Sequence, residues 1–185
     1  MKALIVYGSR SGATREIAGE IGRVLSEQGY AVTVEDARRS KGLDVNRFDL
    51  VVVGSSVFMT MWKRHATAFL KRNAKALAVK NVALFSSGTA GGDPALADYA
   101  RESIAKVARK FPEIRPVALA YFGGYLDFND RGRIDRFFGA VRQDFEKKGI
   151  DTGRPIDQRD WAAIRVWAIG LATKVRSTVQ EMAQA

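Results

Sequence analysis

The chain has 185 residues, 46% of them hydrophobic, and a formal net charge of +10 with a pI near 10.1. This length and hydrophobic content suit a single domain, residues 1–185, with a full core. The sequence contains no cysteine and one histidine, so disulfides and thiolate metal sites are excluded, no metal site is expected, and any redox chemistry must come from a bound organic cofactor.

Apolar runs typical of buried strands alternate with segments of helical periodicity along the chain. We predict strands at 2–7, 31–35, 50–54, 82–86 and 117–122, and helices at 13–28, 64–78, 94–110, 133–147 and 159–184. Asp157 and Asp160 are both candidates for the N-cap of the last helix. The alternation predicts an α/β fold with a doubly wound, five-stranded parallel sheet in the flavodoxin-like order 2-1-3-4-5 and helices on both faces. Ligands of such a sheet bind beyond the carboxyl ends of its strands.

The first strand runs into a loop of small residues that opens a helix, an arrangement typical of anion sites. Gly8 and Gly12 let the backbone turn tightly, and the N–H groups at the start of the helix face the anion. The pattern S-x-S-G-x-T resembles the FMN-phosphate loop of the flavodoxin superfamily. This resemblance assigns the phosphate to Ser9, Arg10, Ser11, Gly12, Ala13 and Thr14. An ordinary strand-to-helix turn is the alternative, and Arg10 and Arg15 either add positive charge or are simply solvated.

Other nucleotide and phosphate sites are excluded by the residues at these strand ends. The first loop lacks the G-x-G-x-x-G of dinucleotide folds and the G-x-x-x-x-G-K-[ST] of P-loops. A response-regulator receiver would need an acidic residue after the third strand, where the chain has Gly54, Ser55 and Ser56. A low-molecular-weight phosphatase would need a cysteine in the first loop.

Aromatic residues follow the third strand, close to the expected ligand site. Phe58 and Trp62 could supply the apolar wall that a flat isoalloxazine ring requires. Alternatively, Trp62 closes the core beneath a helix. The side chains of Met59 and Met61 are expected to fill packing gaps. The cofactor contacts predicted in this loop are Ser55, Ser56, Val57, Phe58, Met59 and Trp62.

A glycine-rich segment follows the fourth strand. Its backbone N–H and C=O groups could approach the pyrimidine edge of a flavin, and a plain surface loop is the alternative. His65, at the start of a helix, is interpreted as a solvated residue rather than an acid or base. No side chain is assigned a catalytic role, because the flavin would carry the chemistry. The contacts predicted in the glycine-rich segment are Ser87, Gly88, Thr89, Ala90, Gly91, Gly92 and Asp93.

From end to end, the sequence resembles the flavodoxin-domain proteins that include the menaquinone-dependent protoporphyrinogen oxidases of bacteria. Besides the opening loop, the resemblance rests on residues 14–18, 53–56, 65–69, 82–86, 123–124, 134–137 and 160–168. It implies an FMN oxidoreductase of heme biosynthesis that takes reducing equivalents from protoporphyrinogen and passes them to a membrane quinone. It also implies that an insert before the last helix, here 127–157, shapes the substrate side or faces the membrane.

The helix-like part of this insert has an apolar stripe bordered by arginine and lysine. The stripe consists of Ile134, Phe137, Phe138, Val141 and Phe145. It predicts either an interfacial or docking surface or a helix packed on the core of the domain. Asp130, Asp144 and Glu146 make the insert more polar than a membrane-binding segment.

The excess of basic residues indicates either attraction to an acidic partner or simply a solvated basic surface. The sequence contains no nucleic-acid module, so no nucleic-acid partner is expected. The expected partners are a small-molecule substrate such as protoporphyrinogen and a quinone or a redox protein; peripheral membrane contact and a homo-oligomer stay open. A flavodoxin-type electron carrier that serves an acidic redox partner is the alternative function, and a module that binds no flavin is a third. Without a long apolar run or a signal sequence, a cytoplasmic location is expected.

Overall fold

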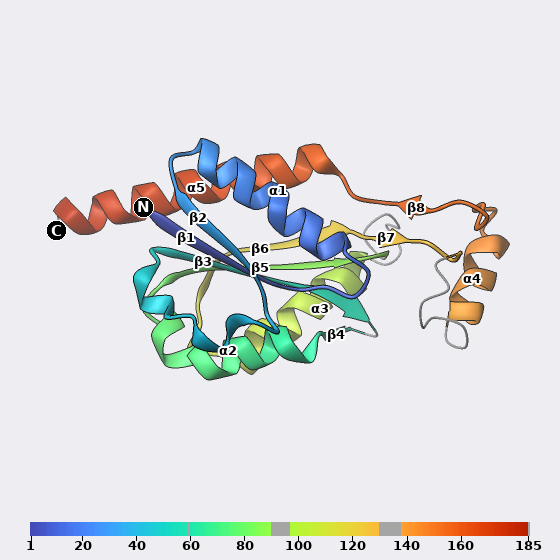
Figure 1. Cartoon of the computed structure of the whole chain (residues 1–185), viewed down its shortest axis with the longest axis horizontal. Helices are drawn as coiled ribbons and strands as arrows, with labels where there is room; N and C mark the ends of the chain where they lie inside the picture. Colours follow the sequence, from blue (N-terminus) through green and yellow to red (C-terminus); the bar gives the residue numbers. More distant parts are fainter. Residues whose placement is uncertain (59, 90–96, 130–137, 185) are drawn as a thin grey trace.

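Five parallel strands form the central sheet of the computed structural model, which describes residues 1–58, 60–89, 97–129 and 138–184. The strands are β1 (Lys2–Gly8), β2 (Ala31–Asp36), β3 (Leu50–Phe58), β5 (Asn81–Gly88) and β6 (Pro116–Gly123). They lie in the order β2-β1-β3-β5-β6, and the short strand β4 (Met61–Trp62) pairs antiparallel with the end of β3. This is the order of the predicted doubly wound sheet, so the α/β fold class is confirmed (Figure 1).

Helices cover both faces of this sheet (Figure 1). One face carries α1 (Ala13–Glu27) and α5 (Trp161–Gln184), and the other carries α2 (Arg64–Leu77) and α3 (Ala97–Lys110). Short 3₁₀ turns at Ser40–Gly42 and Val45–Arg47 lie between β2 and β3. Because parallel neighbours need crossover connections, the loops that leave the strands all start at the carboxyl edge of the sheet.

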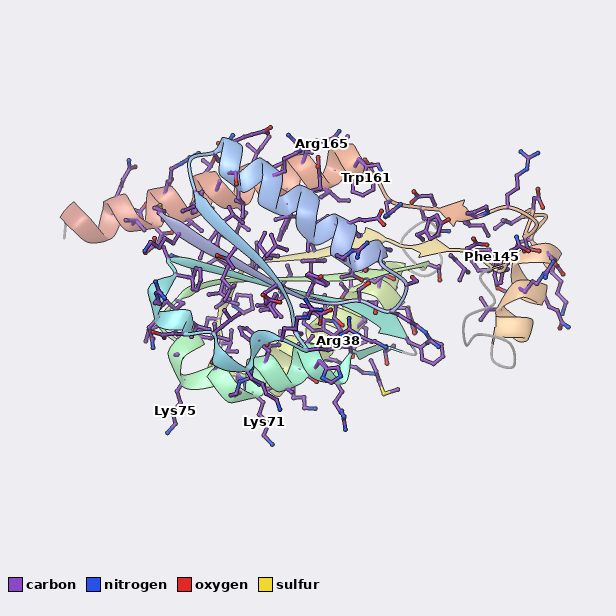
Figure 2. The ribbon with its side chains drawn as sticks, in the orientation of Figure 1. Arg38, Lys71, Lys75, Phe145, Trp161 and Arg165 are labelled. Carbon is purple, nitrogen blue, oxygen red and sulfur yellow. The ribbon has the colours of Figure 1, made fainter. Side chains whose placement is uncertain are left out.

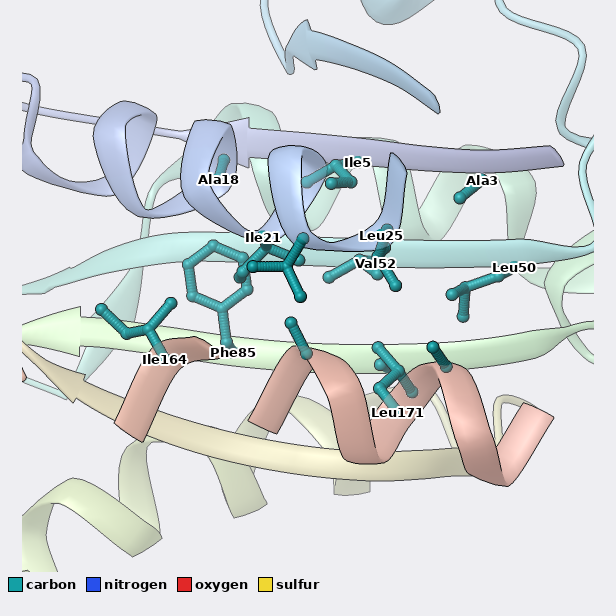
Figure 3. Close-up of a cluster of buried hydrophobic side chains, with 14 of the residues drawn as sticks. Ala3, Ile5, Ala18, Ile21, Leu25, Leu50, Val52, Phe85, Ile164 and Leu171 are labelled. Atoms are coloured by element: carbon teal, nitrogen blue, oxygen red, sulfur yellow. The ribbon is translucent and has the colours of Figure 1, made fainter. Parts of the chain in front are cut away.

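The core has two layers, because successive side chains of a strand point to opposite faces of the sheet. Ile5 of β1 and Phe85 of β5 are buried together with Ile21 of α1 and Ile164 of α5, as Figure 3 shows. Leu4, the neighbour of Ile5, packs instead in the layer under α2 and α3. Both faces of the sheet are therefore apolar, which explains why the strands appear in the sequence as continuous apolar runs.

The chain between β6 and α5 forms an extension beyond the carboxyl edge of the sheet (Figure 1). There β7 (Tyr125–Leu126) pairs antiparallel with β8 (Ile156–Asp157), and α4 (Phe138–Lys147) lies between them in sequence. The rings of Phe128 and Phe145 meet edge-on with centroids 5.9 Å apart, so α4 contacts residues of the extension itself. Ile134 and Phe137 of the predicted apolar stripe lie outside the described residues.

Pairing and capping shift several element boundaries from their predicted positions. β3 continues past residue 54 to Phe58, because its last residues pair with β4, which the sequence analysis did not predict. Asp160 is the N-cap of α5, since its Oδ1 accepts the Ala163 N–H at 2.9 Å, whereas Asp157 pairs with Arg159. Residues 94–96 and 133–137 of the predicted helices lie outside the described part. Within the described part, no helix combines the length and apolarity needed to cross a membrane.

Candidate functional site

The described parts of three loops lie side by side at the carboxyl edge of the sheet. The sheet register pairs Gly8 with Ser55, Ser55 with Ser86, and Ser56 with Ser87. Because parallel strands end at the same edge, segments far apart in the sequence become neighbours there. They are called the first loop (9–14), the second loop (55–62) and the third loop (87–93).

A left-handed glycine shapes the first loop. Gly12 has φ +101° and is the N-cap of α1, and its N–H donates to the Ser9 hydroxyl at 3.0 Å. Its C=O accepts the Glu16 N–H at 3.1 Å, which closes the first turn of the helix. Arg10 and Ser11 are exposed. Since the first N–H groups of an α-helix have no intrahelical acceptor, this geometry suits an anion.

Two buried hydrogen bonds connect the end of β5 to the first and second loops. The hydroxyls of Thr14 and Ser87 lie 2.9 Å apart, which joins the first loop to the third. The indole N–H of Trp62 donates to Ser86 Oγ at 2.8 Å, which joins the second loop to the end of β5. Ala13 is also buried, at the start of α1. The structure therefore brings predicted residues of all three loops into one region.

The two aromatic residues of the second loop have different surroundings. Trp62 is 7% exposed and packs in the core layer under α2, as the core interpretation expects. Phe58 is half-buried, like Ser56 and Val57 before it, and the guanidinium of Arg10 lies 5.0 Å from its ring centroid. Phe58 is thus the more accessible aromatic ring of this loop.

Hydrogen bonds fix the backbone of the second loop at both ends. Ser55 is buried, and its hydroxyl accepts the Lys63 N–H at 2.8 Å. Thr60 has φ +62° and is the only non-glycine residue of the described chain with a positive φ; its N–H donates to the Tyr99 hydroxyl at 2.6 Å. A strained backbone is often found at functional sites. Met59 lies outside the described residues.

The third loop begins with a close approach between two strands. Ser87 is buried and Thr89 is half-buried. A Cβ on Gly88 would lie 2.6 Å from the hydroxyl of Tyr121, so a side chain would displace that tyrosine. Four predicted contacts of this loop lie outside the described residues: Ala90, Gly91, Gly92 and Asp93.

Arg159, which the sequence analysis missed, fastens the start of α5 to the first turn of α1. Its side chain is 7% exposed, and its guanidinium pairs with Glu16 at 2.6 Å and with Asp157 at 2.7 Å. The ring centroids of Tyr125 and Trp161 lie 5.3 Å and 4.7 Å from it. Its hydrogen bonds and charge lower the pKa of Asp157. No local pattern could reveal this residue, because Glu16 is 143 positions away.

Lys63, the residue before α2, is a second charged group that the sequence analysis missed. A Cβ added to Gly8 would lie 3.0 Å from the Lys63 Cβ, so the lysine side chain starts directly beside the end of β1. Partial burial lowers the pKa of its ammonium, and the like charges of Arg10 and Arg38 lower it further. Within the described residues, no group of three or more Asp, Glu, His or Cys side chains could hold a metal ion. The charge at this edge suits anions.

Comparisons with known proteins agree with this fold. Residues 4–142 match the family model described as a flavodoxin domain. The protoporphyrinogen IX dehydrogenase (quinone) of Escherichia coli (strain K12) is 26% identical over 172 residues, 93% of this chain and 95% of that protein. A flavodoxin from the domain Archaea has a TM-score of 0.58 at 22% identity, over 95% of this chain and 99% of that chain. A short-chain flavodoxin associated with a non-canonical PDU bacterial microcompartment has a TM-score of 0.63 at 13% identity, with the same coverage. The chain belongs to the flavodoxin-domain family.

Proposed function

We propose that the three loops bind FMN and that the chain is an FMN-dependent oxidoreductase. The first loop is the observation that carries this proposal, because a left-handed Gly12, a serine turn and the start of α1 converge there. When bound, FMN supplies the acceptance and release of reducing equivalents. The chain itself binds and orients the cofactor, so no side chain is assigned as an acid or a base.

The first loop would hold the FMN phosphate. Its backbone N–H groups and the positive end of the α1 dipole would stabilise a dianion, and Arg10 would add a positive charge. Thr14 also bonds to Ser87, so the phosphate contact and the third loop would be positioned together. The residues proposed for the phosphate are Ser9, Arg10, Ser11, Gly12, Ala13 and Thr14.

The second and third loops would enclose the isoalloxazine ring. Phe58 supplies the apolar face, because it is the more accessible aromatic residue of the second loop. Trp62 would support this wall from the core through its bond to Ser86. The backbone from Ser87 to Asp93 would meet the pyrimidine edge, where a flavin has both donors and acceptors in one plane.

The reaction that we propose is the oxidation of protoporphyrinogen with a quinone as acceptor. The named relative supports it, because the alignment spans 93% of this chain and 95% of that enzyme. The net charge of +10 also suits a substrate that carries carboxylates. Purified protein loaded with FMN should oxidise protoporphyrinogen when menaquinone is present. FMN-loaded protein that oxidises none with any quinone would contradict the proposed reaction.

An electron carrier is the second candidate, and the composition of α2 favours it. This helix carries five lysine, arginine or histidine residues and no acidic residue, which suits an acidic redox protein as partner. A carrier should be reduced by a ferredoxin- or flavodoxin-type reductase and should show two separate one-electron steps in a redox titration. An enzyme of the proposed type needs neither.

A further inference from the structure

We propose that Lys63 and Arg38, with Arg10 at their border, form a second anion site on the α2 side of the carboxyl edge. The site would hold a carboxylate or phosphate group of the molecule that reacts at the flavin. This inference rests on the proposed function, because it names the substrate class at the same edge: a small molecule with at least one anionic group.

Lys63 is held in place but unpaired. Its backbone N–H donates to Ser55 Oγ at 2.8 Å, and its side chain starts beside Gly8 and Ala66. Within the part of the chain that the structure describes, its ammonium makes no hydrogen bond or ion pair, although the residue is half-buried. Partial burial lowers the pKa of this ammonium, because its charged form loses part of its hydration, and a bound anion would offset that loss.

Arg38 is a fixed donor near this lysine. Its Nε and Nη2 bond to Asp36 at the end of β2, at 3.0 Å and 2.7 Å, which orients the guanidinium. The side chain is still 67% exposed, so its remaining N–H groups can reach a ligand. Asp36, two residues before Arg38, pairs with Tyr7 in the sheet, and Gly8, the next residue of β1, lies beside Lys63. The charge of Arg38 accordingly lowers the lysine pKa. Asp36 is neutralised by Arg38 and is not among the groups that act on Lys63.

Arg10 connects this cluster to the proposed flavin site. Its guanidinium lies over the ring of Phe58, and its charge also lowers the pKa of Lys63. The cluster therefore borders the wall that would face the isoalloxazine ring. An anionic group held there would place the rest of a substrate beside that ring.

The cluster lies elsewhere on the molecule than Lys71 and Lys75 of α2. Figure 2 shows Lys71 and Lys75 pointing from α2 away from the sheet, whereas Arg38 lies near the N-terminal end of this helix. His65, the second residue of α2, is exposed. Lys75 is therefore a matched control, because it has the same charge and lies on α2, the helix that Lys63 precedes, but far from the carboxyl edge.

The test uses the FMN-loaded protein and calorimetric titration with two probes, citrate and inorganic pyrophosphate. Binding of citrate alone identifies a carboxylate site, and binding of pyrophosphate alone identifies a phosphate site. Lys63→Gln should weaken the affinity for whichever probe binds by about tenfold or more, as the loss of a charge-assisted hydrogen bond predicts. Lys63→Arg should keep affinity within about threefold, because the charge remains. Lys75→Gln should leave it unchanged, and Lys63→Gln should leave the Kd of FMN within about twofold.

Three results would overturn the inference. In the first, neither probe binds the FMN-loaded wild type, and Lys63→Gln weakens the affinity for FMN instead. The lysine then belongs to the site of the FMN phosphate, and only the FMN proposal stands. If Lys75→Gln weakens the probes as much as Lys63→Gln, binding is a property of the whole basic surface. If neither probe binds and FMN affinity is unchanged, the cluster is no anion site. A protein that takes up no FMN refutes the proposed function, and the same titration without FMN then decides on the anion site separately.

Discussion

The two sides of the carboxyl edge differ in how completely their cations are paired with carboxylates. On the α1 side, cations pair with carboxylates: Arg159 pairs with Glu16, and Arg165 with Glu20 at 2.5 Å. What this side offers an anion is backbone N–H groups and hydroxyls. On the α2 side, Arg38 also pairs with a carboxylate, that of Asp36, but Lys63 pairs with no acidic residue of the described chain. Fixed neutral donors select the shape of a ligand, whereas unpaired charges select its sign and are screened by salt.

The largest effect is expected from Gly12→Ala on the α1 side. Gly12 has φ +101°, and a left-handed conformation costs a residue with a Cβ about 1–2 kcal/mol. The free loop would relax to avoid this strain, and binding would have to restore it, so the Kd of FMN should rise about 5- to 30-fold. Fluorescence titration with FMN measures this change. Gly19→Ala is the control, since Gly19 lies within α1 with no atom near its added Cβ.

The next prediction is a loss of stability in Thr14→Val, which breaks the hydrogen bond between the first and third loops. The variant leaves the buried Ser87 hydroxyl unpaired, so the free energy of unfolding should fall by about 1–2 kcal/mol. Urea unfolding measures this difference. The control is Thr178→Val, which loses only an exposed bond to the Lys174 C=O and should change stability by less than about 0.5 kcal/mol. Equal losses of unfolding free energy in both variants would show that the buried hydrogen bond stabilises the fold no more than the exposed one.

Arg159→Gln should reduce the preference for FMN over riboflavin. The change leaves the Glu16 carboxylate uncompensated, and one of its oxygens lies 3.8 Å from the place of a Cβ on Gly12. Repulsion of the phosphate should raise the Kd of FMN about fivefold, equivalent to about 1 kcal/mol, and should leave riboflavin unaffected. Parallel titrations with both flavins distinguish this from a general loss of structure, which would weaken both. Arg154→Gln, at an exposed ion pair with Asp151, is the matched control.

The smallest effect concerns pH and the contact between α1 and α5. Hydrogen bonds from Arg23 and Arg165 lower the pKa of Glu20 from 4.5 to about 2. Because the folded-state pKa lies below the unfolded one, the stabilisation is present above pH 4.5 and is lost as the pH falls toward 2. Both arginines are half exposed, so the expected loss is only about 1 kcal/mol. Glu20→Gln should flatten this part of the pH profile in urea unfolding, and an unchanged profile would refute the assignment.

The sequence predicted the sheet because burial on both faces leaves a direct signature. Each predicted strand from 2–7 to 117–122 lies within an observed strand, since apolar runs bounded by small or charged residues have few other arrangements. β4 was missed because two residues carry no periodic signal. The same is true of β7 and β8, whose pairing spans 30 positions of the extension.

The candidate site was predictable only where its signal is local. The first loop lies within six consecutive residues, and its left-handed glycine is encoded by the glycine itself. Arg159 and Lys63 could not be found in this way, because their neighbours come from other parts of the chain. The burial of Trp62 also depends on a distant partner, Ser86, so its two interpretations could not be separated from sequence alone. The single-domain organisation, the FMN contacts and a homo-oligomer stay predictions.

The central claim is that the first loop binds the phosphate of FMN. The most direct test is a titration of the purified protein with FMN and, separately, with riboflavin, in which quenching of flavin fluorescence reports binding. The account predicts binding of one FMN per chain and a Kd for riboflavin at least about tenfold higher, because riboflavin lacks the charged group that the loop and the α1 dipole stabilise. Equal affinity for the two flavins, or no binding of FMN, would contradict it.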